Sequence, residues 1–352
     1  MRWREQLRLL AAVQLLPALE SGEETLVGGQ AVLEGVMMRS PHAWGISVRK
    51  PDGEMICHSE PLERPSEKHP WMGWPMIRGV MTLGQAMVLG FRALRFSANV
   101  ALAEIQASEE SEKEKSPAPA GGSSNEKAKK FEISGWVAAV NIIFSVGFFI
   151  FMYKFLPLLA ATELKRFYPV LGTQIGFNLV DGVIRILLFL LFIWGLSLWR
   201  DIRRVYEYHG AEHKTVFAFE SGEPLSVEAA QRFSTLHPRC GTSFLMTVML
   251  ISIAVYTLVP VTSFGARFAI RVALLPVIAG GSYEIIRFAA KLRNRTGSSV
   301  AAWLFTALTA PGLWLQRITT QPPADDQVEC AISALDQAMA LERSRGGELV
   351  IA

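Results

Sequence analysis

The most informative residues of this chain are His209-Gly-Ala-Glu212-His213. On a helix, positions four apart lie one turn above each other, so both imidazoles would face the same way. Two neutral imidazoles placed like this can occupy two corners of a zinc tetrahedron, with Glu212 beside them to orient or deprotonate a metal-bound water. The order His-x-x-Glu-His is that of the inverted zinc-hydrolase motif. The alternative is an interfacial helix that carries two polar histidines and no metal.

Three further residues could complete such a site. His237 and Cys240 flank a proline in a turn directly before an apolar segment, and both residue types bind zinc. Glu284 lies near the end of a later apolar segment, about seventy residues after the histidine pair, a separation at which inverted zinc hydrolases can supply their third ligand. Each has a structural alternative: a turn with an inert thiol, or an ion pair of Glu284 with Arg287. Residues that could support the ligands are Glu207, Tyr208 and Glu220.

The number of ligands decides what the site can do. A catalytic tetrahedral zinc site needs three protein ligands and an open position, whereas four protein ligands close the site and make it structural. His209 and His213 are the best two candidates, and the sequence does not choose among His237, Cys240 and Glu284 for the third. The sequence therefore leaves both a catalytic and a structural site open.

The composition favours a membrane protein. Half of the 352 residues are hydrophobic and only 19% are charged, which is typical of chains with membrane-spanning segments. The formal net charge of +3 comes from scattered basic residues and gives no case for nucleic-acid binding. The three cysteines lie far apart, so reduced cytosolic thiols fit better than a disulfide framework.

Four apolar segments, at 133–153, 176–199, 244–263 and 268–288, are each near the length that crosses a bilayer. Basic residues gather before the first, between the second and third, and after the fourth, so the positive-inside rule predicts cytosolic termini and a cytosolic 200–243 loop. No helix breaker separates the second segment from His209, which predicts one continuous helix that carries the motif to the cytosolic interface. This topology would bring the histidine pair, the 237–240 turn and Glu284 to the same side of the membrane.

The remaining segments complete the predicted organisation. The fold class is a membrane α-helical protein with about four transmembrane helices and a small N-terminal β-containing cytosolic subdomain, α+β overall. Pro51-Asp52-Gly53 predicts a β-turn between two strands. The helix at 76–105 either lies on the membrane surface or packs on the transmembrane bundle, with Gly79, Gly84 and Gly90 at close contacts. Residues 300–315 are too short to span and suit an interfacial or re-entrant segment. The expected divisions are an amphipathic segment at 1–25, a β-rich subdomain at 26–70, an amphipathic helix at 71–106, a disordered linker at 107–130, the transmembrane region with its cytosolic loop at 131–320, and a cytosolic C-terminal helix at 321–352.

A second polar group lies inside the membrane-spanning region. Asp181 and Arg185 are four residues apart in the second apolar segment, which indicates an intramembrane ion pair. Because Asn178 lies beside them, a small polar pathway is an alternative interpretation.

Five longer motifs occur in order along the chain. They are Gly28-Gly-Gln-Ala-Val-Leu-Glu-Gly-Val-Met-Met-Arg39, Val48-Arg-Lys-Pro-Asp-Gly53, Tyr208-His-Gly-Ala-Glu-His-Lys-Thr215, Leu236-His-Pro-Arg-Cys-Gly-Thr242 and Pro311-Gly-Leu-Trp-Leu-Gln-Arg317. Together they resemble the YqhQ-like family of bacterial membrane proteins, described as predicted metal-dependent enzymes. The resemblance spans residues 26–340, apart from the length of the 107–130 linker. It implies a protein of the bacterial inner membrane with a metal site at His209, Glu212, His213, His237 and Cys240, and it supplies no substrate.

The first hypothesis is a metal-dependent membrane hydrolase. A divalent, zinc-like ion would lie at the cytosolic interface, and Glu212 would be the general base for attack on an amide or ester of a peptide or lipid. The second hypothesis is a non-catalytic membrane scaffold or assembly factor with a structural metal site, and the third is a transporter that uses the region of Asn178 and Asp181. The expected partners are membrane lipid and a peptide or lipid substrate, with a homo-oligomer left open and nucleic acid excluded.

Overall fold

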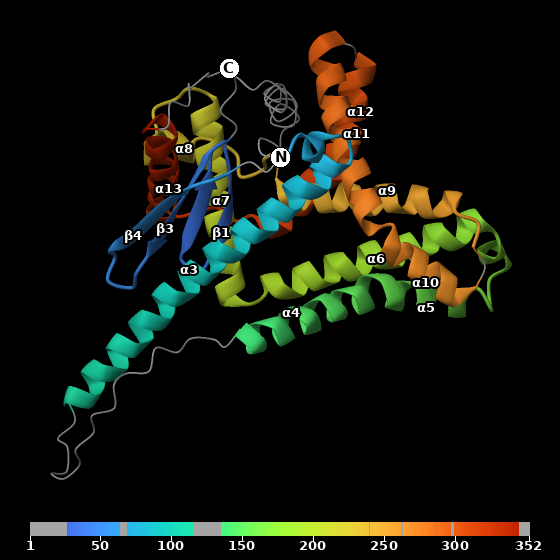
Figure 1. Ribbon diagram of the computed structural model, residues 1–352, viewed down its shortest axis with the longest axis horizontal. Coiled ribbons are helices and arrows are strands. Elements are labelled where there is room, and N and C mark those ends of the chain that lie inside the picture. The colour runs from blue at the N-terminus through green and yellow to red at the C-terminus, as the bar shows by residue number, and fades with distance from the viewer. Residues whose placement is uncertain are drawn as a thin grey trace. The chain divides into compact units, whose positions relative to one another are not determined.

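A computed structural model describes residues 27–63, 69–115, 135–238, 240–261, 263–296 and 299–344 (Figure 1). The described chain is mostly helical, with an antiparallel sheet near the N-terminus, which confirms the predicted fold class. It divides into two units. The first comprises Met1–Val100, Leu190–Val255 and Leu274–Ala352, and the second comprises Ala101–Phe189 and Tyr256–Ala273. The expected amphipathic segment at 1–25 and the linker from 116 to 130 lie outside the described residues.

The sheet is a four-stranded antiparallel meander in the order β1-β2-β3-β4. Its strands are Gly28–Val32 (β1), Gly35–Arg39 (β2), Ala43–Arg49 (β3) and Met55–Pro61 (β4). The predicted turn at Pro51-Asp52-Gly53 joins β3 to β4, where Gly53 has a φ of 92° and Asp52 Oδ1 accepts the N–H of Glu54. Glycine adopts this positive φ without a steric penalty, which is why the turn forms here.

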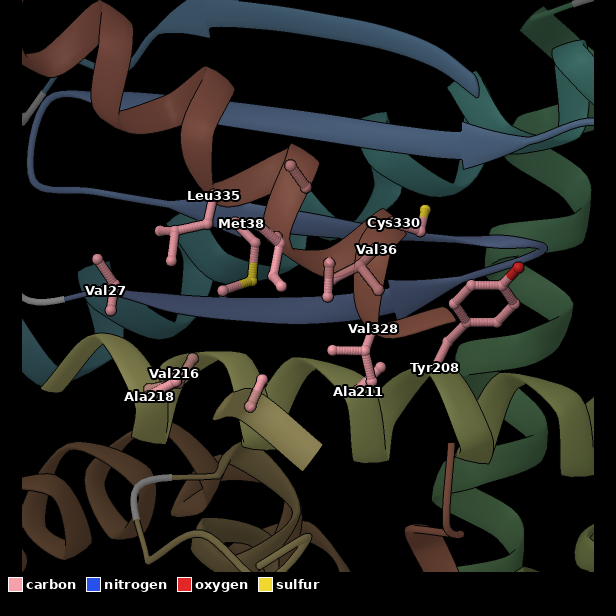
Figure 2. Packing of buried hydrophobic residues seen from close by; sticks show 14 of the residues in the cluster. Val27, Val36, Met38, Tyr208, Ala211, Val216, Ala218, Val328, Cys330 and Leu335 are labelled. Carbon is pink, nitrogen blue, oxygen red and sulfur yellow. The ribbon is translucent and has the colours of Figure 1, made fainter. Parts of the chain in front are cut away.

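Both faces of the sheet are covered by helices of the first unit. On β2, Val36 and Met38 face the helices α7 (Arg200–Glu220) and α13 (Asp325–Ser344), whose residues Tyr208 and Leu335 belong to the same buried cluster (Figure 2). Met37, which lies between them, faces the other way, as the two-residue period of a strand requires. The predicted C-terminal amphipathic helix thus exists, and its apolar face packs on the sheet.

The helix α3 (Ile77–Lys115) covers the opposite face of the sheet. Its residues Leu89 and Ala93 are buried in one cluster with Trp44 of β3, and Ser97 Oγ donates a hydrogen bond to the Leu33 carbonyl at 2.7 Å. The expected close contact with another apolar helix is found at Gly79, where a Cβ would meet Tyr283. At Gly90 a Cβ would meet Gln30 of the sheet instead, and Gly84 faces open space. The helix also extends to Lys115, beyond the expected start of the linker at 107.

Among the described residues, four helical stretches are long and apolar enough to cross a membrane, and one bent pair adds a fifth candidate. The four are Ile77–Gln106, Ile143–Leu164, Gln174–Ser197 and Gly241–Leu258, and the pair is Phe264–Ala273 with Leu275–Phe288, bent by 50°. Compared with the predicted segments, the first crossing moves from 133–153 to Ile143–Leu164, because the helix continues without a break to Leu164. The stretch Ile77–Gln106, expected as an amphipathic helix, is an additional candidate.

The expectation of one continuous helix from the second crossing to His209 is wrong. Helix α6 (Gln174–Ser197) ends in a tightened turn, in which the Leu198 and Trp199 amides bond carbonyls three residues back. Trp199 then adopts an extended backbone, with φ −81° and ψ 130°, and α7 begins at Arg200. Helix propensity alone does not reveal such a break, because Gly195 is the only helix breaker near it and a single glycine is tolerated inside a helix.

The remaining elements of the described residues are short connectors and further helices. In the second unit, Leu158, Ala161 and Phe177 form a small buried core with Phe264 and Phe268 packed against it. The helix over the expected interfacial segment carries Pro311 and is not among the candidate spans. The elements are η3 (Pro70–Gly73), α4 (Gly135–Ile150), the π-helical turn η4 (Phe151–Phe155), α5 (Leu156–Leu164), η5 (Pro169–Gly172), α8 (Val227–Gln231), α9 (Gly241–Leu258), α10 (Phe264–Ala273), α11 (Leu275–Thr296) and α12 (Ser299–Thr319).

Candidate metal centre

The histidine pair lies on the buried half of α7. His209 and His213 are one helical turn apart, with their ring centroids 4.4 Å from each other. The helix is fixed here by Ala211, which packs on the sheet side, and by Gly210, where a Cβ would meet the Gln321 carbonyl oxygen at 2.1 Å. Glycine is required at this close approach of two backbones. The two imidazoles therefore occupy a rigid, well-packed segment.

Backbone carbonyls orient both rings. The Nδ1 atom of His209 lies 2.8 Å from the Thr319 carbonyl oxygen, and the Nδ1 atom of His213 lies 2.5 Å from that of Thr235. Because a carbonyl oxygen only accepts, each Nδ1 carries the proton, and a neutral ring keeps its lone pair on Nε2. Metal-binding histidines are commonly fixed in this way, through a hydrogen bond from the nitrogen that does not bind the metal.

Cys240 completes the group. One ligand atom each of His209, His213 and Cys240 lies within 4.8 Å of the others, so these three residues could hold a metal ion. The sulfur is 3.2 Å from Nε2 of His209 and 3.1 Å from Oγ1 of Thr242. It precedes α9 directly, in the turn that the sequence predicted, where the Cys240 amide bonds the His237 carbonyl at 3.4 Å.

An unsatisfied atom supports the fit of a metal to this group. Among the described residues, no group hydrogen-bonds to the buried Nε2 of His213. A buried polar atom without a partner reduces stability unless water or an ion satisfies it. Two imidazole nitrogens and one thiolate are also a donor set that suits zinc. The chemistry of the residues therefore fits a zinc-like ion.

The charges inside the group couple His209 to Cys240. Burial alone would lower the pKa of His209, but the Cys240 sulfur, followed by Glu212 and the Thr319 carbonyl, raises it to about 9. Burial alone would raise the pKa of Cys240, but His209 and His213 hold it well below its ordinary value. Without a metal, His209 and Cys240 thus form an imidazolium–thiolate pair, and a thiolate is the form of cysteine that binds zinc.

Glu212 lies beside the group and is held by the sheet. Its side chain is buried, and Oε1 accepts the backbone N–H of Gly29 in β1 at 3.0 Å. A Cβ at Gly29 would lie 2.6 Å from the Met37 carbonyl oxygen and 2.8 Å from Cγ of Glu212, so only glycine fits between them. The carboxylate is not one of the three grouped ligands, but its charge helps to raise the pKa of His209.

His237 lies next to the group without joining it. The side chain of Gln316 brackets its backbone, accepting the His237 N–H and donating to the His237 carbonyl, both at 2.7 Å. The ring packs against Phe217 with centroids 4.4 Å apart, and Nε2 is 3.5 Å from Oε2 of Glu220. Burial lowers the pKa of His237 to about 4, so the ring is neutral at pH 7.

Glu284 is engaged elsewhere. Its carboxylate accepts two hydrogen bonds from Arg78 of α3, at 2.7 and 2.5 Å, and one from the Met76 amide at 3.2 Å. This bidentate ion pair joins α11 to α3, whereas the sequence offered Arg287 as the structural partner. The structure therefore brings together His209, His213 and Cys240 with Glu212 beside them, and it does not bring Glu284 into the group.

The residues expected to support the ligands have separate roles. Glu207 accepts from Gln327, Tyr208 donates to Glu34, and Glu220 contacts His237. The groups that hold the site most directly are Gly29, Gln316 and the carbonyls of Thr235 and Thr319, which sequence reasoning missed. Backbone groups leave no signal in the residue type, and only the glycine at 29 could have hinted at a close approach.

The family match covers the three grouped ligands and Glu212, and the sheet with Gly29 lies outside it. Residues 74–341 match the family described as "Protein of unknown function (DUF1385)". The chain belongs to this family. It is also 33% identical over 316 residues to the "Uncharacterized protein YqhQ" of Bacillus subtilis (strain 168), an alignment that covers 90% of this chain and 92% of that protein. No solved structure matches. Membership of the DUF1385 family supports the resemblance seen in the motifs and assigns no reaction.

Proposed function

We propose that this protein is a metal-dependent membrane hydrolase, with a zinc-like ion held by His209, His213 and Cys240 and with Glu212 as its general base. The observation that carries the proposal is the geometry of the two histidines. Each donates Nδ1–H to a backbone carbonyl and keeps Nε2 as the ligand atom, and the ligand atoms of both lie within 4.8 Å of that of Cys240. Three protein ligands leave a fourth tetrahedral position for a reactant, as in catalytic zinc sites.

The residues around the ion would have separate roles in the reaction. A bound zinc ion supplies Lewis-acid activation of water and of a substrate carbonyl. Glu212 is anchored through Oε1 to Gly29, which leaves Oε2 to accept the proton from the attacking water. The carbonyls of Thr319 and Thr235 keep the imidazoles in the required tautomer. The substrate class that suits this chemistry is an amide or ester of a peptide or lipid.

A structural metal site is the second candidate, and the burial of His213 favours it. This side chain is 1% exposed, and the three ligands together with their carbonyl partners link α7, the end of α12 and the segment before α9. An ion there would join these segments, as structural zinc does in proteins that lose their fold without it. The protein would then act as a membrane scaffold or assembly factor.

Metal content tests the site itself. The full-length protein, purified in detergent, is expected to carry about one zinc-like ion per chain by elemental mass spectrometry. His213→Ala and Cys240→Ser should each lose it. His58→Ala is the matched control, because His58 stacks on Phe96 away from the group and its loss should leave the metal content unchanged. Equal, negligible metal in the wild type and all variants would contradict a metal site.

Glu212→Gln separates the two candidates. A general base should be indispensable while the ion and the fold persist, so this variant should keep its metal and fail to complement a deletion of the gene. Full complementation by a metal-containing Glu212→Gln protein would exclude catalysis by this carboxylate. The structural candidate would then account for the site.

Contacts within the first unit also constrain how the chain crosses the membrane. The sheet, α7 and α13 share one buried core, so all three lie on the same side. The chain must therefore cross an even number of times between β4 and α7, where three candidate helices lie. We infer that α3 is the helix that does not cross, and the contacts of Leu89, Ala93 and Ser97 with the sheet, in the middle of its apolar stretch, support this.

Four candidate crossings then remain in the part of the chain that the structure describes. They are Ile143–Leu164, Gln174–Ser197, Gly241–Leu258 and the bent pair Phe264–Ala273 with Leu275–Phe288. The excess of basic residues in the 200–243 loop supports a cytosolic position for the sheet, α7, α13 and the metal group, at a bacterial inner membrane. Helix α3 would lie at the interface, where its exposed residues Met87, Phe91 and Leu94 can contact lipid.

A further inference from the structure

The second unit contains a buried cluster with more positive than negative charge. Lys154, Arg185 and Arg271 are each at most 8% exposed, and Asp181, at 1% exposed, is the carboxylate among them. Both arginines pair with it at 2.5 Å, Arg185 through Oδ2 and Arg271 through Oδ1. The predicted ion pair of Asp181 and Arg185 is thus part of a larger group. Charge inside a membrane-spanning region is costly unless it is compensated, so the excess needs an explanation.

Tyr256 compensates the excess charge only in part. Its hydroxyl accepts a hydrogen bond from Nζ of Lys154 at 3.0 Å and donates one to the Arg271 carbonyl at 3.1 Å. All three cations lie 5.1 to 5.3 Å from the centre of its ring. These contacts are favourable but carry no full negative charge. Within the described part of the chain, no carboxylate forms an ion pair with Lys154.

A small pocket opens beside this cluster. Its lining includes the polar residues Arg271, Tyr256 and Asn178 and the apolar residues Val259 and Ile270, and Arg267 belongs to the same lining. Arg267 stacks 4.0 Å over the ring of Phe177 and donates through Nε to the Val261 carbonyl at 2.6 Å. This leaves its two terminal nitrogens as a fork of donors. It forms no ion pair with any carboxylate of the described residues.

We propose that this pocket binds a phosphate-bearing anion, either the phosphate of an anionic lipid headgroup or free inorganic phosphate. A guanidinium fork matches two oxygens of a phosphate group, and the buried cations behind it add a field that favours negative charge. Asp181 is not available to bind a cation, because arginines occupy both of its carboxylate oxygens. The apolar side chains of Val259 and Ile270 in the lining suit the acyl chains of a lipid.

The test uses the full-length protein in nanodiscs of phosphatidylcholine. Inorganic phosphate is added to one series, with sodium chloride at matched ionic strength as the reference, and phosphatidylglycerol replaces part of the lipid in the other. The melting temperature is followed by tryptophan fluorescence. Arg267→Gln removes the donor fork, and Lys165→Gln is the matched control, because Lys165 is an exposed cation in the turn after α5.

The melting temperature of the wild type should rise as the anion is added. In Arg267→Gln, the anion concentration that gives half of this rise should be roughly tenfold higher, which corresponds to the loss of one charged hydrogen bond. Lys165→Gln should behave like the wild type. Stabilisation by phosphatidylglycerol alone identifies a lipid headgroup, and stabilisation by inorganic phosphate identifies a site open to free anions. The proposal is overturned if neither probe stabilises the wild type or if Arg267→Gln titrates like Lys165→Gln. Should Arg267→Gln not fold, Arg267→Lys, which keeps the charge without the fork, is expected to shift the midpoint in the same direction.

Discussion

Gly29 donates its backbone N–H to Oε1 of Glu212 at 3.0 Å, and this bond joins the first strand of the sheet to the helix that carries both histidines. The sheet therefore positions the acid of the candidate site, although none of its side chains belongs to the grouped ligands. The bond also makes the site sensitive to a single methyl group at position 29.

Gly29→Ala should displace Glu212 and leave the metal in place. The added Cβ would lie 2.6 Å from the Met37 carbonyl oxygen and 2.8 Å from Cγ of Glu212. Such overpacking typically destabilises a protein by about 1 to 3 kcal/mol. We expect a lower melting temperature and poor complementation, with metal content near that of the wild type. Gly28→Ala is the control, since nothing lies within 4 Å of a Cβ there. Equal behaviour of the two variants would contradict the role of the Gly29–Glu212 bond.

The cysteines should differ in reactivity once the metal is removed. The histidines lower the pKa of Cys240 well below its ordinary value, against the opposing effect of burial, so a thiolate is present at pH 7. Burial raises the pKa of Cys330 to about 11, and its thiol donates to the Ser47 carbonyl. Iodoacetamide should therefore modify Cys240 in chelator-treated protein and spare Cys330, as read by peptide mass spectrometry.

Added zinc should then protect Cys240 from iodoacetamide. Cys57 is exposed and serves as the internal control for reagent access, because its modification should not depend on zinc. Modification of Cys240 at the same rate with and without zinc would contradict its role as a ligand.

The sequence predicted the parts of the site that depend on local spacing. His209 and His213 share a helix face because they are four residues apart, and Cys240 lies in a turn marked by proline and glycine. The β3–β4 turn was predictable for the same reason, since Asp52 and Gly53 determine its geometry locally. These features follow from residue type and short-range backbone preference.

The choice among the third ligands could not be made from the sequence, because it depends on distant residues. Gln316 holds the backbone of His237 from 79 positions away, and Arg78 binds Glu284 from 206 positions away. The break between α6 and α7 was equally hidden, since Trp199 has no special preference for extended backbone in this context. Contacts of this kind are decided by tertiary packing, which outweighs local preference.

Glu342 should make the stability depend on pH in acid. Burial alone would raise its pKa, but hydrogen bonds from Ser40 and from the backbone and ring of His42 lower it overall. A lowered pKa in the folded protein means that the carboxylate contributes stability above the ordinary glutamate value of about 4.3, and that this contribution is lost as the pH falls through the folded-state pKa.

Glu342→Gln should therefore lower the melting temperature at pH 7 and have a smaller effect below about pH 4. The amide would place donors against the donors of Ser40 and His42, a loss of about 1 to 3 kcal/mol. Glu228→Gln is the control, because Glu228 forms an exposed ion pair with Arg232 on α8, which contributes little. A difference between wild type and Glu342→Gln that stays constant from pH 7 to pH 4 and below would contradict this assignment.

The inferred topology has a test that uses a native cysteine. Cys57 is exposed on β4, and Lys165 lies in the turn between α5 and α6. If α3 does not cross the membrane, one crossing separates these two positions, and they face opposite sides. A membrane-impermeant maleimide should label Lys165→Cys in intact spheroplasts and Cys57 in inverted vesicles. Glu228→Cys, on α8, should follow Cys57, because α8 packs beside α7 through Ala230. If α3 did cross, a second crossing would return the chain, and Cys57 and the cysteine at position 165 would be labelled from the same side.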